Sequence, residues 1–477
     1  MELFSATVSV ESQDRFFQLQ HHCLDILDPA PDSSGVAGRS IGVFALDQQL
    51  EALRREGFDV ERVEAKPDFF QKRFDLVNRE PYEFSEDPDH VLRSPSAALY
   101  FTSAGIDQML DAWARAWPQL IHLWQLPDRT WGDGAWHIQP HSCRAALVGA
   151  GATAGRRTVL ISSGLHAREW IAPDACMTAL NLLVASYAAN TGIRLSPNAT
   201  SAGKTFTREQ VKAVLERLLV IFYPNANPDG RDFSQAAPQN VLWRKNRRPF
   251  QEGYGVDVNR NFNFLWQYRG APYDDFKITD HLVPGGSSYI NDLYKGTFAG
   301  SEPETRNMQF IIDSYPTLEF FVDVHSNTQT IYLPWGDAPN QQDKQPMNFS
   351  NPAYNDWRGR NPAYGEYLLK TDYDNRESVA KQMLASLKKV QGTTYNYGQS
   401  AVIYGHTVAS ADDYALSRSF LDPKRRRVHT MTFECGVSKG DYAPDTKAER
   451  DVVVRDTCAA LIEMCCIAAG VPSPTVA

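Results

Sequence analysis

A histidine and a glutamate, His166 and Glu169, stand three residues apart, just after an apolar run that ends at Gly164. A second histidine, His325, follows another apolar run much further along the chain. Two imidazoles and one carboxylate are a ligand set of catalytic zinc sites, in which a fourth position stays open. Such a metal lowers the pKa of bound water to about 7 and polarises a carbonyl group. These three residues therefore predict one hydrolytic zinc site.

The His-x-x-Glu spacing also has an ordinary explanation. Such pairs arise by chance in many sequences, so the motif alone is weak. A glutamate is also favourable in the first turn of a helix, and Glu169 comes just before a helix-like segment. The surrounding elements are needed to decide between these two interpretations.

The segments around these residues predict one edge of a sheet. Residues 158–165 and 319–326 are apolar runs of strand length, and residues 172–188 and 304–315 have helical patterns. Apolar strands interleaved with helices indicate an α/β fold, with a mixed, mainly parallel sheet flanked by helices on both faces. Ligands gather beyond the carboxyl ends of such strands. Both histidines are therefore expected at the same edge.

The first 95 residues have a different pattern. Their predicted order is β-α-β-β-α-β, with helices at 11–22 and 47–57, which is typical of a small α+β open sandwich. A charged, proline-bearing connector covers residues 78–96. We therefore predict a domain over residues 1–95 and a second over 96–477. Residues 337–374, polar and rich in Asn, Pro, Tyr and Gln, are expected to form a surface insertion.

Composition excludes some classes of protein. The 477-residue chain has a net charge of -9, which argues against nucleic acid as a partner. The apolar segment 452–471 is interrupted by Arg455, Asp456 and Glu463, so it predicts a packed helix rather than a membrane span. Seven cysteines form no metal-binding pattern, and one stays unpaired in the monomer that we expect. No secretory signal is visible, so the sequence as written predicts an intracellular protein, or a secreted one whose signal was removed.

Eight short blocks resemble, in order, motifs of the M14 metallocarboxypeptidases, the carboxypeptidase A and B family. They are HAREW (166–170), NPDG (227–230), WRKNR (243–247), GVDVNRNF (255–262), SEPET (301–305), VHSNTQ (324–329), YNYGQSAVIY (395–404) and TFECG (432–436). The first 95 residues also resemble the propeptide domain of procarboxypeptidases. The resemblance implies a zymogen that is opened by an activating protease and then acts on peptide or protein C-termini.

The resemblance also implies which residues perform the chemistry. One zinc ion per chain would be held by His166, Glu169 and His325. Glu434 would be the general base, taking a proton from the zinc-bound water and delivering it to the leaving amine. Arg244 would stabilise the developing oxyanion beside the metal.

Four further residues would bind the substrate, as the resemblance implies. Asn259 and Arg260 would hold its terminal carboxylate, for which a planar guanidinium is well suited. Arg168 would bind the peptide further from the cut. Tyr404 would fold over the C-terminal residue and exclude water.

The side-chain preference depends on a segment that departs from the family pattern, TVASADDY at Thr407–Tyr414. With Tyr404 aligned, the position that commonly sets this preference is Ala411. A small, uncharged residue there predicts a preference for apolar or aromatic C-terminal residues. Asp412 and Asp413 follow directly, and a shift of one position would instead favour Lys or Arg.

Two alternative functions remain open. A zinc-binding pseudo-peptidase acting as an interaction module would be expected to lack the base or the carboxylate-binding arginine, whereas Glu434 and Arg260 are both present. An amidohydrolase that acts on small acylated amino acids would not need both the WRKNR and NRN motifs. The motifs therefore favour a peptidase.

Overall fold

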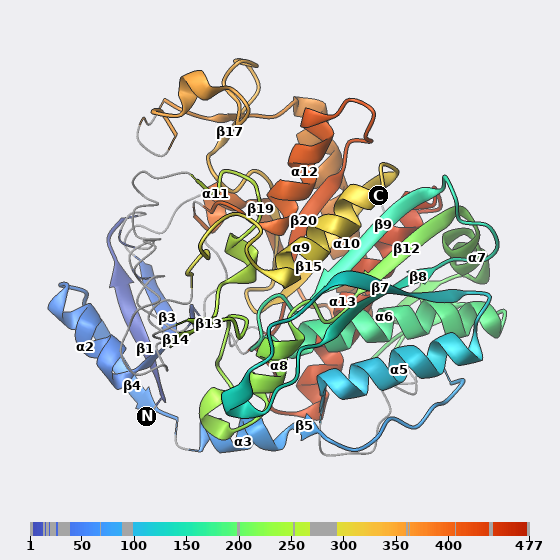
Figure 1. The fold of residues 1–477 in the computed structure, drawn as a ribbon, viewed down its shortest axis with the longest axis horizontal. Coiled ribbons are helices and arrows are strands. Elements are labelled where there is room, and N and C mark those ends of the chain that lie inside the picture. Colours follow the sequence, from blue (N-terminus) through green and yellow to red (C-terminus); the bar gives the residue numbers. More distant parts are fainter. Residues whose placement is uncertain are drawn as a thin grey trace.

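The computed structural model describes residues 3–12, 15, 19, 25–26, 39–66, 68–87, 99–197, 201–250, 253–267, 293–358, 361, 363–405, 407–437 and 442–474. An eight-stranded mixed sheet lies at its centre (Figure 1). The strands are, in spatial order, β19 (Asn396–Gln399), β16 (Thr330–Leu333), β20 (His429–Cys435), β15 (Leu318–Ser326), β9 (Arg157–Ser163), β12 (Leu218–Tyr223), β8 (Ser142–Val148) and β7 (Ile121–Arg129).

The four central strands β20, β15, β9 and β12 are parallel to one another. Antiparallel pairs extend the sheet on both sides, through β8 and β7 at one end and through β16 at the other. The carboxyl ends of β9, β15 and β20 therefore meet at one edge. This arrangement confirms the predicted mixed, mainly parallel sheet.

Helices cover both faces of this sheet, which explains why its strands are continuously apolar. On β9, Val159 and Ile161 belong to the larger hydrophobic core, whereas Leu160 between them points into the core on the opposite face. The helices that contribute to the larger core are α5 (Ser103–Ala116), α6 (Ile171–Ala188), α7 (Arg208–Arg217), α10 (Lys370–Gln391) and α13 (Lys447–Ala468). Those on the opposite face are α9 (Pro303–Ser314) and α12 (Ala411–Leu421).

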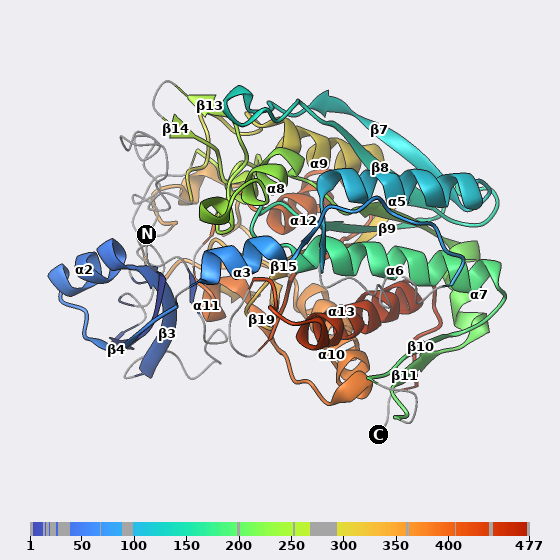
Figure 2. The same ribbon diagram turned by 90° about the horizontal axis from the view of Figure 1, so that it is seen from below.

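Two of these helices are strongly apolar and buried. α6 has the length and composition of a membrane span, but residues Ile171–Ser186 are buried inside the protein, as expected of a core helix. α13 packs against α6 and α10 (Figure 2). Its Glu463 forms an ion pair with Lys204, with a nitrogen–oxygen distance of 2.8 Å. The predicted packed helix near the C-terminus is thus confirmed.

A separate four-stranded sheet precedes this unit. Its spatial order is β2 (Asp25–Ile26), β3 (Arg39–Leu46), β1 (Leu3–Val10) and β4 (Val60–Ala65), with α2 (Asp47–Arg55) following β3. Alternate residues of β1, such as Val8 and Val10, build a small core with Leu50 and Leu53 of α2. The predicted strands and the second helix are present. Most of the first predicted helix, and the predicted boundary near residue 95, lie outside the described residues.

The segment that follows this sheet packs closely on the larger unit. It forms α3 (Phe69–Asp75), α8 (Pro228–Ser234) lies near it (Figure 2), and β5 (Val77–Asn78) pairs in parallel with β6 (Tyr100–Phe101). Arg73 of α3 is fully buried and donates to the backbone oxygen of Arg168 at 3.0 Å. The sequence patterns did not predict α3. The buried Arg73 side chain ties this segment to the HAREW loop.

Residues 337–374 carry a small core of their own at one end of the molecule (Figure 1). The short strands β17 (Asn340–Gln341) and β18 (Glu366–Tyr367) pair in parallel. Between them, Arg358 is buried and donates to the hydroxyl oxygen of Tyr364 at 2.9 Å. The last residues of this range enter α10, which begins at Lys370.

Candidate metal centre

The turn after β9 carries two of the three predicted ligands. Gly164 has a φ of 78°, and a Cβ atom there would lie 3.2 Å from Cγ of Pro173 and 3.3 Å from the backbone oxygen of Pro224. A glycine therefore lets the chain turn sharply at this crowded point. His166 and Glu169 follow in the turn, before α6 begins at Ile171.

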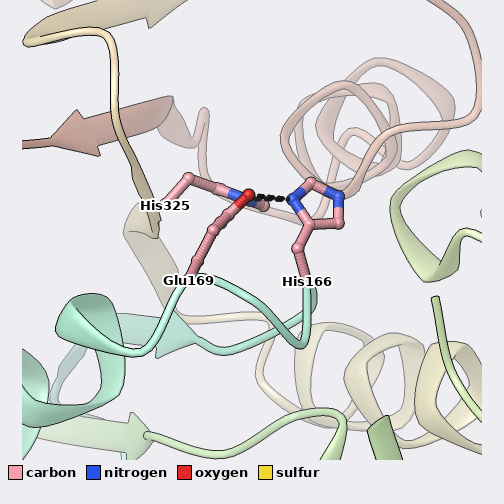
Figure 3. Close-up of side chains that lie close together, drawn as sticks. All are labelled: His166, Glu169 and His325. Atoms are coloured by element: carbon pink, nitrogen blue, oxygen red, sulfur yellow. Dashed lines mark hydrogen bonds and ion pairs between the residues drawn. The ribbon is translucent and has the colours of Figure 1, made fainter. Parts of the chain in front are cut away.

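The third ligand comes from the end of β15, and all three side chains meet (Figure 3). Nδ1 of His166 lies 2.7 Å from Oε1 of Glu169, and Nδ1 of His325 lies 2.9 Å from Oε2 of the same carboxylate. The two Nδ1 atoms are 3.0 Å apart. All three residues are buried. Side chains that are 159 residues apart in the sequence therefore converge on one point, as predicted.

The charges of this group fit a divalent cation. Burial alone would raise the pKa of Glu169, but the two imidazoles hold it well below its usual range, so the residue stays an anion. Burial would lower the pKa of His325, but Asp323 and Glu169 raise it well above its ordinary value. Two imidazole nitrogens and a carboxylate directed at one point form a suitable zinc site.

Arg244 lies beside the ligands and is held by Asp257. Its Nε and Nη2 atoms donate to Oδ2 of Asp257 at 3.1 and 2.9 Å, and its Nη1 lies 3.9 Å from Oε1 of Glu169. Burial would raise the pKa of Asp257, but Arg244 and His166 keep it well below its usual range. Arg244 is therefore a fixed cation next to the metal position.

Asn259 and Arg260 occupy a short 3-10 turn close by, η3 (Val258–Arg260). Oδ1 of Asn259 accepts from the backbone N–H of Ala411 at 2.9 Å, and its Nδ2 lies 3.5 Å from Nε2 of His325. Nη1 of Arg260 donates to the backbone oxygen of Asn259 at 2.8 Å. Nε of Arg260 is buried and has no hydrogen-bond partner among the residues that the structure describes. An anion is the natural partner for such a donor.

Glu434 reaches the same edge from β20. It is paired in register with His325 of the parallel strand β15, so both side chains point to the same face of the sheet. Glu434 is only partly buried. The pKa of Tyr332 is raised well above its usual value, mainly by the burial of Tyr332 itself and further by the charge of Glu434.

Arg168 and Tyr404 are two further residues that the sequence predicts to bind the substrate. The Arg168 guanidinium lies over the ring of Tyr442 at 4.4 Å, and its Nη1 donates to the backbone oxygen of Leu242 at 3.4 Å. The ring of Tyr404 packs edge-on against Tyr332 at 5.3 Å. Each of these side chains thus packs against a tyrosine ring.

Two carboxylates of the site were missed by the sequence analysis. Asp257 lies 3.3 Å from Nε2 of His166, and Asp323 lies 2.7 Å from Nε2 of His325. Asp257 stands inside the GVDVNRNF block, and Asp323 precedes His325 by two residues in a strand. An acidic residue at that spacing in an apolar strand was the available signal.

Comparison with known proteins agrees with this geometry. Residues 108–448 match the family model Peptidase_M14, described as zinc carboxypeptidase. Zinc carboxypeptidase A 1 of Anopheles gambiae is 31% identical over 246 residues, 51% of this chain and 42% of that protein. Carboxypeptidase A2 of Mus musculus is 25% identical over 268 residues, 55% of this chain and 49% of that protein. The chain thus spans less than half the length of either relative.

Solved structures show the same fold. Carboxypeptidase A of Helicoverpa armigera has a TM-score of 0.64 at 18% identity, covering 99% of this chain and 98% of that one. The thrombin activatable fibrinolysis inhibitor has a TM-score of 0.62 at 18% identity, covering 98% of both chains. Since the family model spans most of the sequence, the chain belongs to the zinc carboxypeptidase family M14.

Proposed function

We propose that this protein is a zinc-dependent metallocarboxypeptidase that hydrolyses the last peptide bond of peptides or proteins. The convergence of His166, Glu169 and His325 carries this proposal, because two imidazoles and a carboxylate that meet at one buried point match the ligand set of a catalytic zinc site. When bound, zinc would lower the pKa of a water molecule and polarise the scissile carbonyl group.

The remaining steps fall to residues of this chain. Glu434 takes the proton of the attacking water and delivers it to the leaving amine, which its position opposite His325 supports. Arg244 stabilises the negative charge that develops on the carbonyl oxygen, and its ion pair with Asp257 holds it in place beforehand.

The substrate's terminal carboxylate is assigned to Arg260 and Asn259. The buried Nε of Arg260 supports this assignment, because a carboxylate would satisfy it. Arg168 binds the peptide further from the cut, and Tyr404 closes over the C-terminal residue. Residues 1–95 act as an inhibitory domain, in keeping with the separate four-stranded sheet.

The central test is Glu434→Gln. Glutamine keeps the shape of the side chain but cannot act as a base, so we expect zinc to be retained and hydrolysis of blocked dipeptides to fall by about 10²–10⁴-fold. Metal analysis and the rate of amino-acid release are measured on the same sample, with wild-type protein plus chelator as control. A wild-type protein that binds zinc but releases no amino acid, even after removal of its N-terminal part, would favour the interaction module.

The C-terminal side-chain preference that we propose is for apolar or aromatic residues. It rests on Ala411, which is small, buried and bonded through its N–H to Asn259. One observation favours Lys or Arg as the second candidate. Asp412 is buried, burial raises its pKa, and no lysine or arginine in the described part of the chain forms an ion pair with it.

A panel of blocked dipeptides ending in Phe, Leu, Lys, Arg and Glu separates these candidates. We expect fastest release of Phe or Leu in the wild type and an unchanged order in Asp412→Asn, because Ala411 carries no charge to lose. Preferred release of Lys or Arg, abolished in Asp412→Asn, would assign the preference to Asp412.

A further inference from the structure

We propose that Asp323 is a positioning residue of the metal centre, which fixes the orientation and the tautomer of His325. Its Oδ2 atom lies 2.7 Å from Nε2 of His325, and both side chains are almost completely buried. The inference rests on the proposed zinc site but concerns a residue that does not itself face the metal position.

The strand geometry explains how these two side chains meet. Asp323 and His325 are two residues apart in β15, so both point to the same face of the sheet. β15 pairs in parallel with β9, which places Ser162 opposite Asp323. The Ser162 hydroxyl donates to Oδ1 of Asp323 at 2.6 Å. Ser162 therefore holds one oxygen of the Asp323 carboxylate, and the other oxygen accepts a hydrogen bond from His325.

This contact decides which imidazole nitrogen is available to a metal. A carboxylate can only accept, so Nε2 of a neutral His325 must carry the proton that it donates. Nδ1 then keeps its lone pair, and Nδ1 is the atom that lies 2.9 Å from Glu169 and 3.0 Å from Nδ1 of His166. A carboxylate behind a metal-binding histidine orients its ring and makes it a stronger ligand.

The other imidazole is supported less directly. Asp257 lies 3.3 Å from Nε2 of His166, and the pair does not have the geometry of a hydrogen bond. The charge of Asp257 is also balanced by the two bonds from Arg244. Asp323 differs, because no lysine or arginine among the residues that the structure describes pairs with it. Asp323 therefore adds a negative charge behind the metal position that is not balanced by a fixed cation.

The experiment compares zinc binding by Asp323→Asn and Asp323→Leu with that of Ser162→Ala. Zinc affinity is measured by competition with a chelator of known affinity, which does not require enzymatic activity. We expect roughly 10- to 100-fold weaker binding for Asp323→Asn, because the charge behind His325 is lost. Asp323→Leu should bind zinc no more tightly than Asp323→Asn. Ser162→Ala keeps the carboxylate on His325, so its affinity should stay closest to the wild-type value.

A spectroscopic measurement tests the tautomer itself. Nitrogen-15 NMR of the histidine side chains in the metal-free protein, recorded at a pH high enough for His325 to be neutral, should show its proton on Nε2, and Asp323→Leu should lose this preference. Asp323→Asn preserves the shape of the side chain, so it carries the test if the leucine variant does not fold. Wild-type zinc affinity in Asp323→Asn would overturn the inference while leaving the zinc site intact. Absence of zinc binding by the wild type would overturn both.

Discussion

Arg260 is a buried cation whose Nε donor lacks an acceptor within the described residues. A buried donor of this kind is costly until a partner arrives, and a substrate carboxylate would supply it. The neighbouring Asn259 is already oriented by the N–H of Ala411. At the scale of single residues, a buried donor next to an oriented amide is an arrangement that an anionic ligand would complete.

The first prediction concerns this cation. Arg260→Ala should lose about 2–5 kcal/mol of transition-state binding, which is roughly 30-fold to several-thousandfold in kcat/KM. Arg260→Lys should recover little, because lysine cannot form the planar two-point contact. The check is kcat/KM for a blocked dipeptide and for its C-terminal amide. If Arg260 binds the carboxylate, the preference for the free acid over the amide shrinks in both variants; an unchanged preference would reject the assignment.

At the scale of elements, the turn between β9 and α6 decides where His166 and Glu169 stand. Gly164 has a positive φ and close neighbours, whereas Gly155 has a similar φ of 76°, but a Cβ added there would meet nothing within 4 Å beyond its chain neighbours. Alanine at either position would incur the backbone penalty of about 1–2 kcal/mol. Only the alanine at Gly164 would also press on Pro173 and the backbone of Pro224.

The second prediction follows from this contrast. Gly164→Ala should be less stable than Gly155→Ala in urea unfolding, and only Gly164→Ala should bind zinc more weakly than the wild type. Stability in urea and zinc affinity are measured on the same preparation of each variant. Comparing the two variants cancels the backbone penalty that they share. Equal zinc affinity in the two variants would mean that the turn does not position the ligands.

The parts that the sequence could predict are those with a local pattern. Strands 158–165 and 319–326 could be recognised because helices cover both of their faces, which makes them continuously apolar. α3 could not, because it is seven residues long and the contact of its buried Arg73 with Arg168 joins residues far apart in the chain. The contact between Asp323 and Ser162 was equally hidden, since the two residues lie 161 positions apart in the sequence.

At the scale of the whole molecule, two sheets are joined by residues that include α3 and β5. The third prediction is that the intact chain hydrolyses blocked dipeptides very slowly and gains activity after cleavage between Glu80 and Pro95. Trypsin can cut this stretch at Arg93, and Arg93→Gln removes that site as a matched control. Full activity of the uncut chain would reject the inhibitory role of the N-terminal domain.

The pairing of Val77–Asn78 with Tyr100–Phe101 spans this stretch, with one strand on each side of it. Cleavage would turn a contact within one chain into an association between two fragments. The linker that now keeps the effective concentration of the two partners high would be lost. Release of the N-terminal fragment would then depend on protein concentration. The activity per molecule of freshly cut protein should therefore rise on dilution.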